Sequence, residues 1–235
     1  MRRAYIQVAL FCLVTNMPDG LAQETQQERQ RTGERARIEA LLKKAQAVVA
    51  YRSKVVVTIQ TYRPGTALEP SIMTRTITSW QKGEYQRMDG HTSVAGQSGT
   101  AIIRPDGYYQ QTEGSEMYTR MPIPPNFSIG TNTKWAGLLD NPTLHILGTE
   151  VMDGKEATAI EYIVYAVGNY ITVKVWLWNE HGLPLKQITE QPEEPRIPRQ
   201  VVTTEYSEYV FGDIPDSTFD IPTDKVQELP ADWHL

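Results

Sequence analysis

The spacing of apolar residues changes once along the chain, close to residue 50. Before that point the apolar positions recur at intervals of three and four, with charged residues between them, and they are Ile38, Leu41, Leu42, Ala45, Val48 and Val49. This spacing predicts one amphipathic α-helix over residues 34–50. The preceding stretch, 24–37, is almost entirely polar, so it is either a mobile segment or the frayed start of that helix.

After residue 50 the apolar positions alternate with a period of two, which is typical of β-strands. The predicted strands are 54–62, 73–81, 84–88, 100–103, 108–112 and 116–120, followed after a break by 144–151, 156–166, 170–179, 185–190 and 200–211. Short turns such as Lys82-Gly83 and Asp153-Gly154 separate them. Connections this short join strands as hairpins, so the sequence predicts an antiparallel sheet.

Two segments depart from the strand pattern. A proline-rich connector covers 121–127, and Trp135, Leu138 and Leu139 then lie at helical spacing before Asn141-Pro142. This predicts one short mid-chain helix, since the residue before a proline disfavours helical backbone. In the tail, Phe219 and Ile221 follow a tight turn and are expected to fold back into the core.

These elements predict an α+β fold with far more strand than helix. About eleven strands in one antiparallel sheet cannot lie flat, because strand twist makes so wide a sheet curl. We therefore expect a single curved sheet, an unclosed β half-barrel, with the N-terminal helix and the short mid-chain helix covering its concave face. One domain would span 34–235, after a polar segment at 23–33.

The N-terminus has the features of a secretory signal peptide. Arg2 and Arg3 precede an apolar run at 8–14, and Gly20-Leu21-Ala22 offers small residues at a cleavage site, so residues 1–22 are predicted to be removed. An uncleaved anchor is the alternative, but the run is shorter than the roughly 20 residues of a membrane span. The one cysteine, Cys12, lies inside this leader. The exported chain would then form no disulfide.

Three motifs in the C-terminal half follow one another in a recognisable order. Gly148 to Gly154 reads G-x-E-x-x-D-G, an aromatic strand then turns at Gly182-Leu183-Pro184, and a long strand ends in I-P-x-x-x-F-x-I-P from Ile214. This part resembles the bacterial lipoprotein-localisation-factor superfamily (LolA/LolB-like), which also contains RseB-like envelope-stress sensors. The resemblance covers the last third of the chain by motif and most of it by element order.

The resemblance implies a single LolA-like lipid-binding domain, an unclosed barrel with a helical lid over a hydrophobic cavity. It implies a non-enzymatic, periplasmic protein whose ligand is a lipid or acyl chain, with a lipoprotein or envelope membrane protein as a further partner. We expect a monomer. The residues predicted to line the cavity or lid are Val57, Ile59, Met117, Met121, Phe127, Trp135, Leu138, Leu139, Ile160, Tyr162, Val173 and Val175. The alternative for each is plain core packing.

Composition and motifs argue against several other functions. The formal charge is −5 and no basic cluster is present, so nucleic-acid binding is not expected. The four histidines are scattered singly, which gives no support for a metal site or cofactor. Gly96-Gln97-Ser98-Gly99 lacks the spacing of a serine-nucleophile turn. An envelope regulatory module that binds a protein by its surface is the alternative function, and a lipid hydrolase is the least supported.

Overall fold

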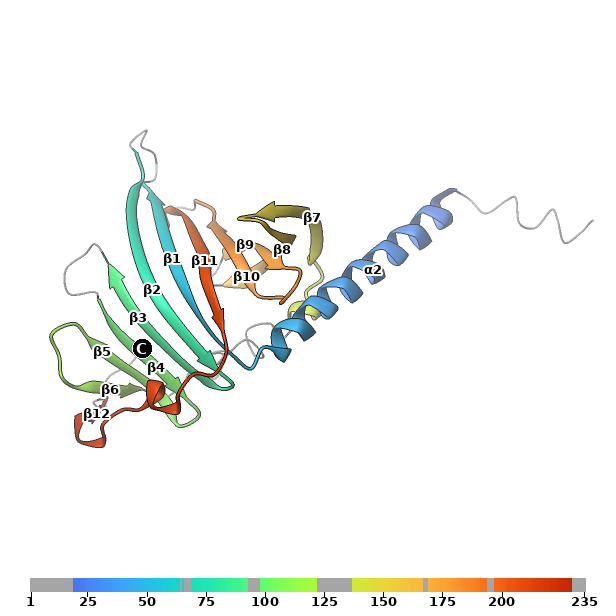
Figure 1. Ribbon diagram of the computed structural model, residues 1–235. Helices are drawn as coiled ribbons and strands as arrows, with labels where there is room; N and C mark the ends of the chain where they lie inside the picture. Colours follow the sequence, from blue (N-terminus) through green and yellow to red (C-terminus); the bar gives the residue numbers. More distant parts are fainter. Residues whose placement is uncertain are drawn as a thin grey trace, which may run out of the picture.

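The computed structural model describes residues 19–63, 65, 69–92, 98–121, 137–166, 169–193 and 197–229. Within them, alternating segments form one twelve-stranded sheet, in the order β12-β6-β5-β4-β3-β2-β1-β11-β10-β9-β8-β7. Neighbouring strands are antiparallel except β12 and β6, which are parallel. Because β12 and β7 are two separate edges, the sheet remains open, and Figure 1 shows it strongly twisted.

The strands are β1 (Ala50–Tyr62), β2 (Ser71–Lys82), β3 (Tyr85–Thr92), β4 (Gly99–Arg104), β5 (Gly107–Thr112), β6 (Tyr118–Met121), β7 (His145–Met152), β8 (Lys155–Ala166), β9 (Asn169–Trp178), β10 (Pro184–Gln191), β11 (Arg199–Phe211) and β12 (Val226–Glu228). The helical elements are α2 (Asp19–Ala47) and the 3-10 turns η1 (Leu138–Asp140), η2 (Asp216–Phe219) and η3 (Thr223–Lys225). None of the described helices is both long enough and apolar enough to cross a membrane.

The sequence prediction and the structure agree on the class of fold and on eleven of the strands. Three details differ. The helix spans Asp19–Ala47 rather than residues 34–50, so the polar segment 23–33 lies within it and Val48 and Val49 lie beyond its end. The mid-chain helix is a single 3-10 turn, and Trp135 falls outside the described residues. The tail adds the strand β12, which pairs with β6.

Cross-strand pairing defines two faces of the sheet, because directly paired residues place their side chains on the same side. Val175 pairs with Ile160, and Val57 pairs with Thr204 and Arg75. We call the side that carries these residues the helix face, since α2 packs on it. The other side, which carries residues such as Ile102 and Tyr109, is the opposite face.

The C-terminal half of α2 covers one end of the helix face. Its apolar residues join η1, β8 and β9 in one buried cluster, which comprises Ile38, Leu41, Leu42, Leu138, Leu144, Ile160, Val173, Val175 and Leu177. Polar contacts add to this packing: the guanidinium of Arg37 donates to Thr149 and Thr158, and Ile146 N–H donates to the Glu34 carboxylate. Beyond this end α2 extends away from the sheet (Figure 1), and residues 28–33 are exposed.

The C-terminal segment covers the opposite face at the other end of the sheet. Phe219, Ile214 and Ile221 are buried there against strand residues, and the whole cluster comprises Ala50, Ile102, Tyr109, Tyr118, Ile214, Phe219 and Ile221. The predicted return of Phe219 and Ile221 into the core is therefore confirmed, with Phe219 only 3% exposed. The two apolar clusters thus lie on different faces and at different ends of the sheet.

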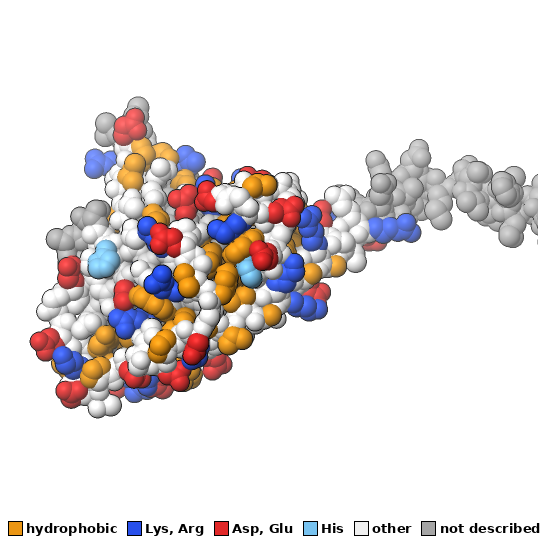
Figure 2. Space-filling model, viewed as in Figure 1, with side chains coloured by type: hydrophobic (Ala, Val, Ile, Leu, Met, Phe, Trp, Pro, Cys, Tyr) orange, Lys and Arg blue, Asp and Glu red, His pale blue; other side chains and the backbone are white. Residues whose placement is uncertain are grey.

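A third packing group lies where β9 and β11 end and β10 begins. The rings of Trp178 and Phe211 each lie 4.3 Å from the ring of His181, and Tyr209 stacks on Phe211. The buried Tyr209 hydroxyl donates to the carbonyl of Pro184, and burial raises its pKa. Figure 2 shows hydrophobic side chains in the middle of the viewed face, with basic and acidic side chains interspersed around them.

Candidate functional site

A hollow of about 360 Å³ lies on the sheet where β2 to β5 run side by side, away from α2. Its volume is within the range of small-molecule sites. Met73, Ile77 and Met88 supply apolar lining on the helix face, and Thr92, Ser98 and Thr112 supply hydroxyl groups. The other lining residues are Arg75, Gly99, Thr100, Ala101, Tyr108, Gln110 and Gln111. Such a mixture suits a ligand with an apolar and a polar part.

Among the described residues of this lining, Arg75 is the one that carries a charge. Its Nε is buried, and among the described residues it has no hydrogen-bond partner. The guanidinium lies over Gly90: a Cβ at that position would be 2.5 Å from Nη2 and 2.6 Å from Nε. The guanidinium can occupy this position because glycine at position 90 has no side chain. Burial raises the pKa of Tyr108, and the positive charge of Arg75 partly offsets that rise.

Three of the predicted cavity residues border this hollow. Val57 pairs with Arg75, Ile59 pairs with Met73, and Met121 pairs with Tyr108, so all three share the helix face with its lining. None of the three is fully buried. Their contact with a ligand stays a prediction, but the strand register places them next to the hollow.

The other predicted residues lie elsewhere. Ile160, Val173, Val175 and Leu138 are buried in the α2 cluster, and Tyr162 and Leu139 pack at its margin. Met117 is half-buried just before β6, and its backbone N–H donates to Ser115. Phe127 and Trp135 lie outside the described residues.

The sequence reasoning did not select Met73, Arg75, Ile77 and Met88. Alternation along 73–77 does place Met73, Arg75 and Ile77 on one side of a strand. That signal was available, but an arginine in a strand is usually exposed to solvent. Only the pairing of β2 with β1 shows that this side is the helix face.

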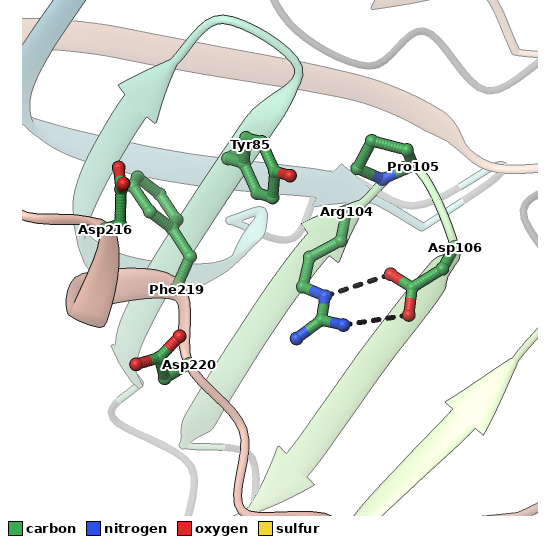
Figure 3. A pocket seen from close by; sticks show the side chains of 7 residues that line it. All are labelled: Tyr85, Arg104, Pro105, Asp106, Asp216, Phe219 and Asp220. Carbon is green, nitrogen blue, oxygen red and sulfur yellow. Dashed lines mark hydrogen bonds and ion pairs between the residues drawn. The ribbon is translucent and has the colours of Figure 1, made fainter.

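A second pocket, of about 430 Å³, lies between the C-terminal segment and the β4–β5 turn. Figure 3 shows its lining, which is Tyr85, Arg104, Pro105, Asp106, Asp216, Phe219 and Asp220. The rings of Tyr85 and Phe219 lie 5.7 Å apart on one side of it. Arg104 makes two hydrogen bonds to Asp106, at 2.9 and 2.8 Å. Arg104 and Asp106 therefore neutralise each other, and Asp216 of the same lining pairs with Lys82.

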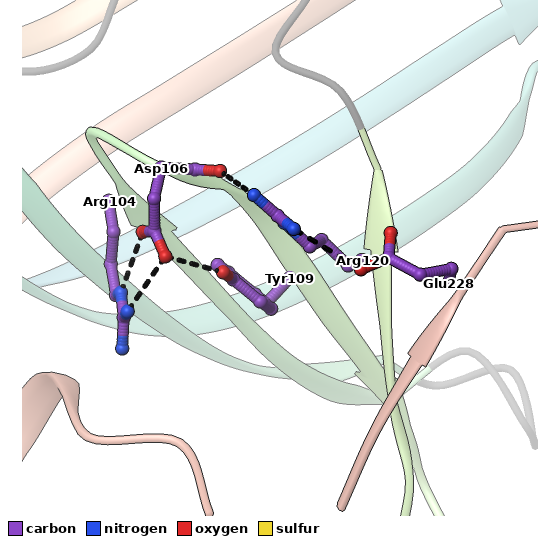
Figure 4. A network of polar contacts seen from close by, with 5 residues as sticks. All are labelled: Arg104, Asp106, Tyr109, Arg120 and Glu228. Carbon is purple, nitrogen blue, oxygen red and sulfur yellow. Dashed lines mark hydrogen bonds and ion pairs between the residues drawn. The ribbon is translucent and has the colours of Figure 1, made fainter. Parts of the chain in front are cut away.

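The same ion pair belongs to a polar network that joins the β4–β5 turn to the tail (Figure 4). Tyr109 donates its hydroxyl proton to Asp106, and Arg120 bonds both the Asp106 carbonyl and the Glu228 carboxylate. The Arg104 guanidinium, followed by the Tyr109 hydroxyl, lowers the pKa of Asp106 to about 2 despite opposing desolvation. These contacts hold the tail strand β12 beside β6. Across the described chain, no three potential metal ligands are grouped closely enough to hold an ion.

Comparisons with known proteins concern the fold. No family model matches the chain, and no curated protein matches it in sequence. A structure of an uncharacterised conserved protein from Thermus thermophilus is similar over 81% of this chain and 98% of that one, with 9% identity and a TM-score of 0.51. At that identity the likeness shows the fold alone.

Two further structures match with lower scores. Lipoprotein LppX from Mycobacterium tuberculosis is 13% identical, with a TM-score of 0.47, over 76% of this chain and 95% of that one. A LolA superfamily protein from Nitrosomonas europaea is 15% identical, with a TM-score of 0.36, over 78% and 97%. The open sheet, the N-terminal helix and the short mid-chain helix form the unclosed half-barrel that the sequence predicted.

Proposed function

We propose that this protein is an exported, non-enzymatic carrier or sensor that binds a lipid or acyl chain on the helix face. The observation that carries the proposal is the hollow over β2 to β5, whose apolar lining is not covered by α2. Met73, Ile77 and Met88 are half-buried there, beside Val57 and Ile59 on the neighbouring strand. Methionine side chains adapt to irregular apolar surfaces such as an acyl chain.

Burial of methylene groups supplies the binding free energy. A chain of about twelve methylenes gains roughly 10 kcal/mol, at about 0.8 kcal/mol for each buried group. Association costs at least about 4 kcal/mol in lost translational and rotational freedom. The net of about 6 kcal/mol corresponds to a dissociation constant of roughly tens of micromolar. Affinity should therefore rise with chain length until the hollow is filled.

A binding measurement with two matched variants tests the proposal. The delipidated protein should bind a fluorescent fatty-acid probe, and Met73→Trp should weaken that binding at least about tenfold by filling the hollow. Thr74→Trp is the control, because Thr74 is the next residue on β2, exposed on the opposite face. The proposal fails if no probe binds, or if both variants bind as the parent does. A stoichiometric protein partner without lipid would favour the regulatory module instead.

Export and the lid are proposed on the sequence alone. The signal peptide predicts a mature N-terminus after Ala22, which N-terminal sequencing of protein from the periplasmic fraction would check. A full-length N-terminus in the membrane fraction would favour the anchor. We assign the helical lid that the resemblance implies to the mid-chain segment 121–141, which falls largely outside the described residues.

A further inference from the structure

The charge of Arg75 lacks the compensation that nearby cations have. Arg87 pairs with Asp89, Arg104 with Asp106, and Arg120 with Glu228, all on β3 to β6 or the tail. Within the described chain Arg75 forms no ion pair, and its buried Nε has no acceptor. A buried donor without a partner is costly and rare in native proteins. The unpaired Nε–H of Arg75 therefore indicates that an acceptor from a ligand binds there.

The surroundings of Arg75 specify what kind of acceptor fits. No aspartate or glutamate is found among the described residues that line the hollow, so an incoming anion meets no repelling carboxylate from them. Gly90 lies against the guanidinium and leaves its planar group room to lie flat. Arginine binds planar carboxylates and phosphates through two parallel hydrogen bonds, and such charge-assisted bonds are among the strongest in proteins.

Apolar groups lie on both sides of Arg75 along its strand. Met73 and Ile77 share its face on β2, and Val57 is its direct partner on β1. A ligand group held by the guanidinium therefore has apolar side chains around it, as the first methylenes of an acyl chain require. A free inorganic anion would use the guanidinium but leave this apolar lining unfilled.

We propose that Arg75 binds the anionic group, a carboxylate or a phosphate, of an amphipathic ligand whose chain lies on the adjoining helix face. The inference rests on the proposed function and narrows it from lipids in general to anionic amphipaths. Gly90 positions the arginine, and Met73 and Ile77 flank the start of the chain. A neutral lipid of the same length binds in the same hollow but lacks the contact with the guanidinium.

Calorimetric titration of the purified protein with four probes tests the inference: dodecanoate, dodecyl phosphate, dodecanol and inorganic phosphate. We expect the two anionic amphipaths to bind at least about tenfold more tightly than dodecanol. Arg75→Met should remove that difference while leaving dodecanol affinity within about twofold, and Arg75→Lys should restore part of it. Gly90→Ala should act like Arg75→Met, because the new Cβ displaces the guanidinium.

Arg52→Met is the matched control, since Arg52 is exposed on the opposite face of β1 and should leave all four affinities unchanged. Equal affinities for dodecanoate and dodecanol would overturn the inference and leave the proposed function intact. If inorganic phosphate binds as tightly as dodecyl phosphate does, the site binds anions without using an acyl chain. That result would overturn the inference that the ligand is an amphipath. If no probe binds, both the inference and the proposed function fail. Thermal melts of each variant show whether it is folded.

Discussion

The contact between Gly182 and α2 provides the sharpest test of how the helix is held. Gly182 lies in the turn between β9 and β10 with a φ of +69°, and its N–H donates to the Trp178 carbonyl. A Cβ at this position would collide with the Leu41 carbonyl oxygen and would lie 2.8 Å from the backbone nitrogen of Ala45. Helix backbone cannot rotate aside as a side chain can. Gly182→Ala should therefore push α2 away from the sheet.

The size of the effect follows from two contributions. Alanine in left-handed backbone costs about 1–2 kcal/mol. In addition, Ile38, Leu41 and Leu42 are at most 5% exposed, and burial of each is worth about 1.5–3 kcal/mol. Losing about half of that burial costs roughly 2–4 kcal/mol. We expect Gly182→Ala to lower the free energy of unfolding by roughly 3–6 kcal/mol in all.

Urea denaturation followed by tryptophan fluorescence measures this loss, and amide exchange within α2 reports whether the helix has detached. Gly154→Ala is the matched control, because Gly154 also has a positive φ, of 76°, but a Cβ there would meet nothing within 4 Å. That variant should lose only about 1–2 kcal/mol. If the two variants lose the same free energy, within about 0.5 kcal/mol, then close packing of α2 on the turn is not what excludes a side chain at Gly182.

Three further predictions concern the other parts of the fold. The pKa of Asp106 is about 2, below its unfolded value of 3.8. Its stabilising contribution is therefore present above about pH 4 and is lost as pH falls toward 2. In urea titrations, Asp106→Asn should lower the free energy of unfolding more at pH 6 than at pH 2.5. Burial raises the pKa of Tyr162 from 10 to about 12, so stability should fall as pH rises from 10 to 12, and Tyr162→Phe should weaken that fall in thermal melts at pH 9 and 11. Phe219→Ala should lower the free energy of unfolding, measured by urea denaturation, by about 3–5 kcal/mol. Phe211→Ala should lower it by less than half as much, because Phe211 is 38% exposed.

Exposed residues of the same type control for the two pH effects. Asp153→Asn replaces an exposed carboxylate without an ion pair in the described chain, and it should shift stability equally at both acid pH values. Tyr165→Phe replaces an exposed phenol and should leave the alkaline fall as it is in the parent. Parallel behaviour of Asp106→Asn and Asp153→Asn would refute the role assigned to the Arg104 ion pair. A parent-like alkaline fall in Tyr162→Phe would refute the effect of burial.

The strands could be predicted because their determinants are local. Alternation and short turns, most of them with a glycine, mark the hairpins within about ten residues of chain. β12 has neither signal: three residues pair in parallel with β6, and their contacts, such as Arg120 with Glu228 and Gln227 with Thr119, join residues more than a hundred positions apart. The early start of α2 was missed for another reason. Residues 19–33 carry no apolar stripe, and the good helix formers Gln, Glu and Arg extend the helix by propensity alone.

The candidate site could be predicted only in part, because some of its residues are brought together by contacts between distant parts of the chain. Val57 and Ile59 are apolar residues of an alternating strand, so the sequence marks them as facing an interior. Arg75 is charged, and nothing local shows that its side chain lies over Gly90 and faces the interior too. The G-L-P motif at Gly182 carries a structural constraint. Its physical reason, the close approach of α2, becomes clear only when the helix and the turn are seen together.

The residues that stabilise the fold and the residues proposed to bind the ligand lie in different places on the sheet. The α2 cluster stabilises the β7 to β9 end on the helix face, and the tail cluster stabilises the β2 to β6 end on the opposite face. The helix face over β2 to β5 is left without either cover, and that is where the hollow lies. Substitutions at Met73 or Arg75 should therefore change affinity with little loss of stability, since both residues are only half-buried and belong to neither cluster. Substitutions at Leu41 or Phe219 should do the reverse. For the proposed function, this arrangement would let a ligand bind to the helix face and leave it without unfolding the sheet.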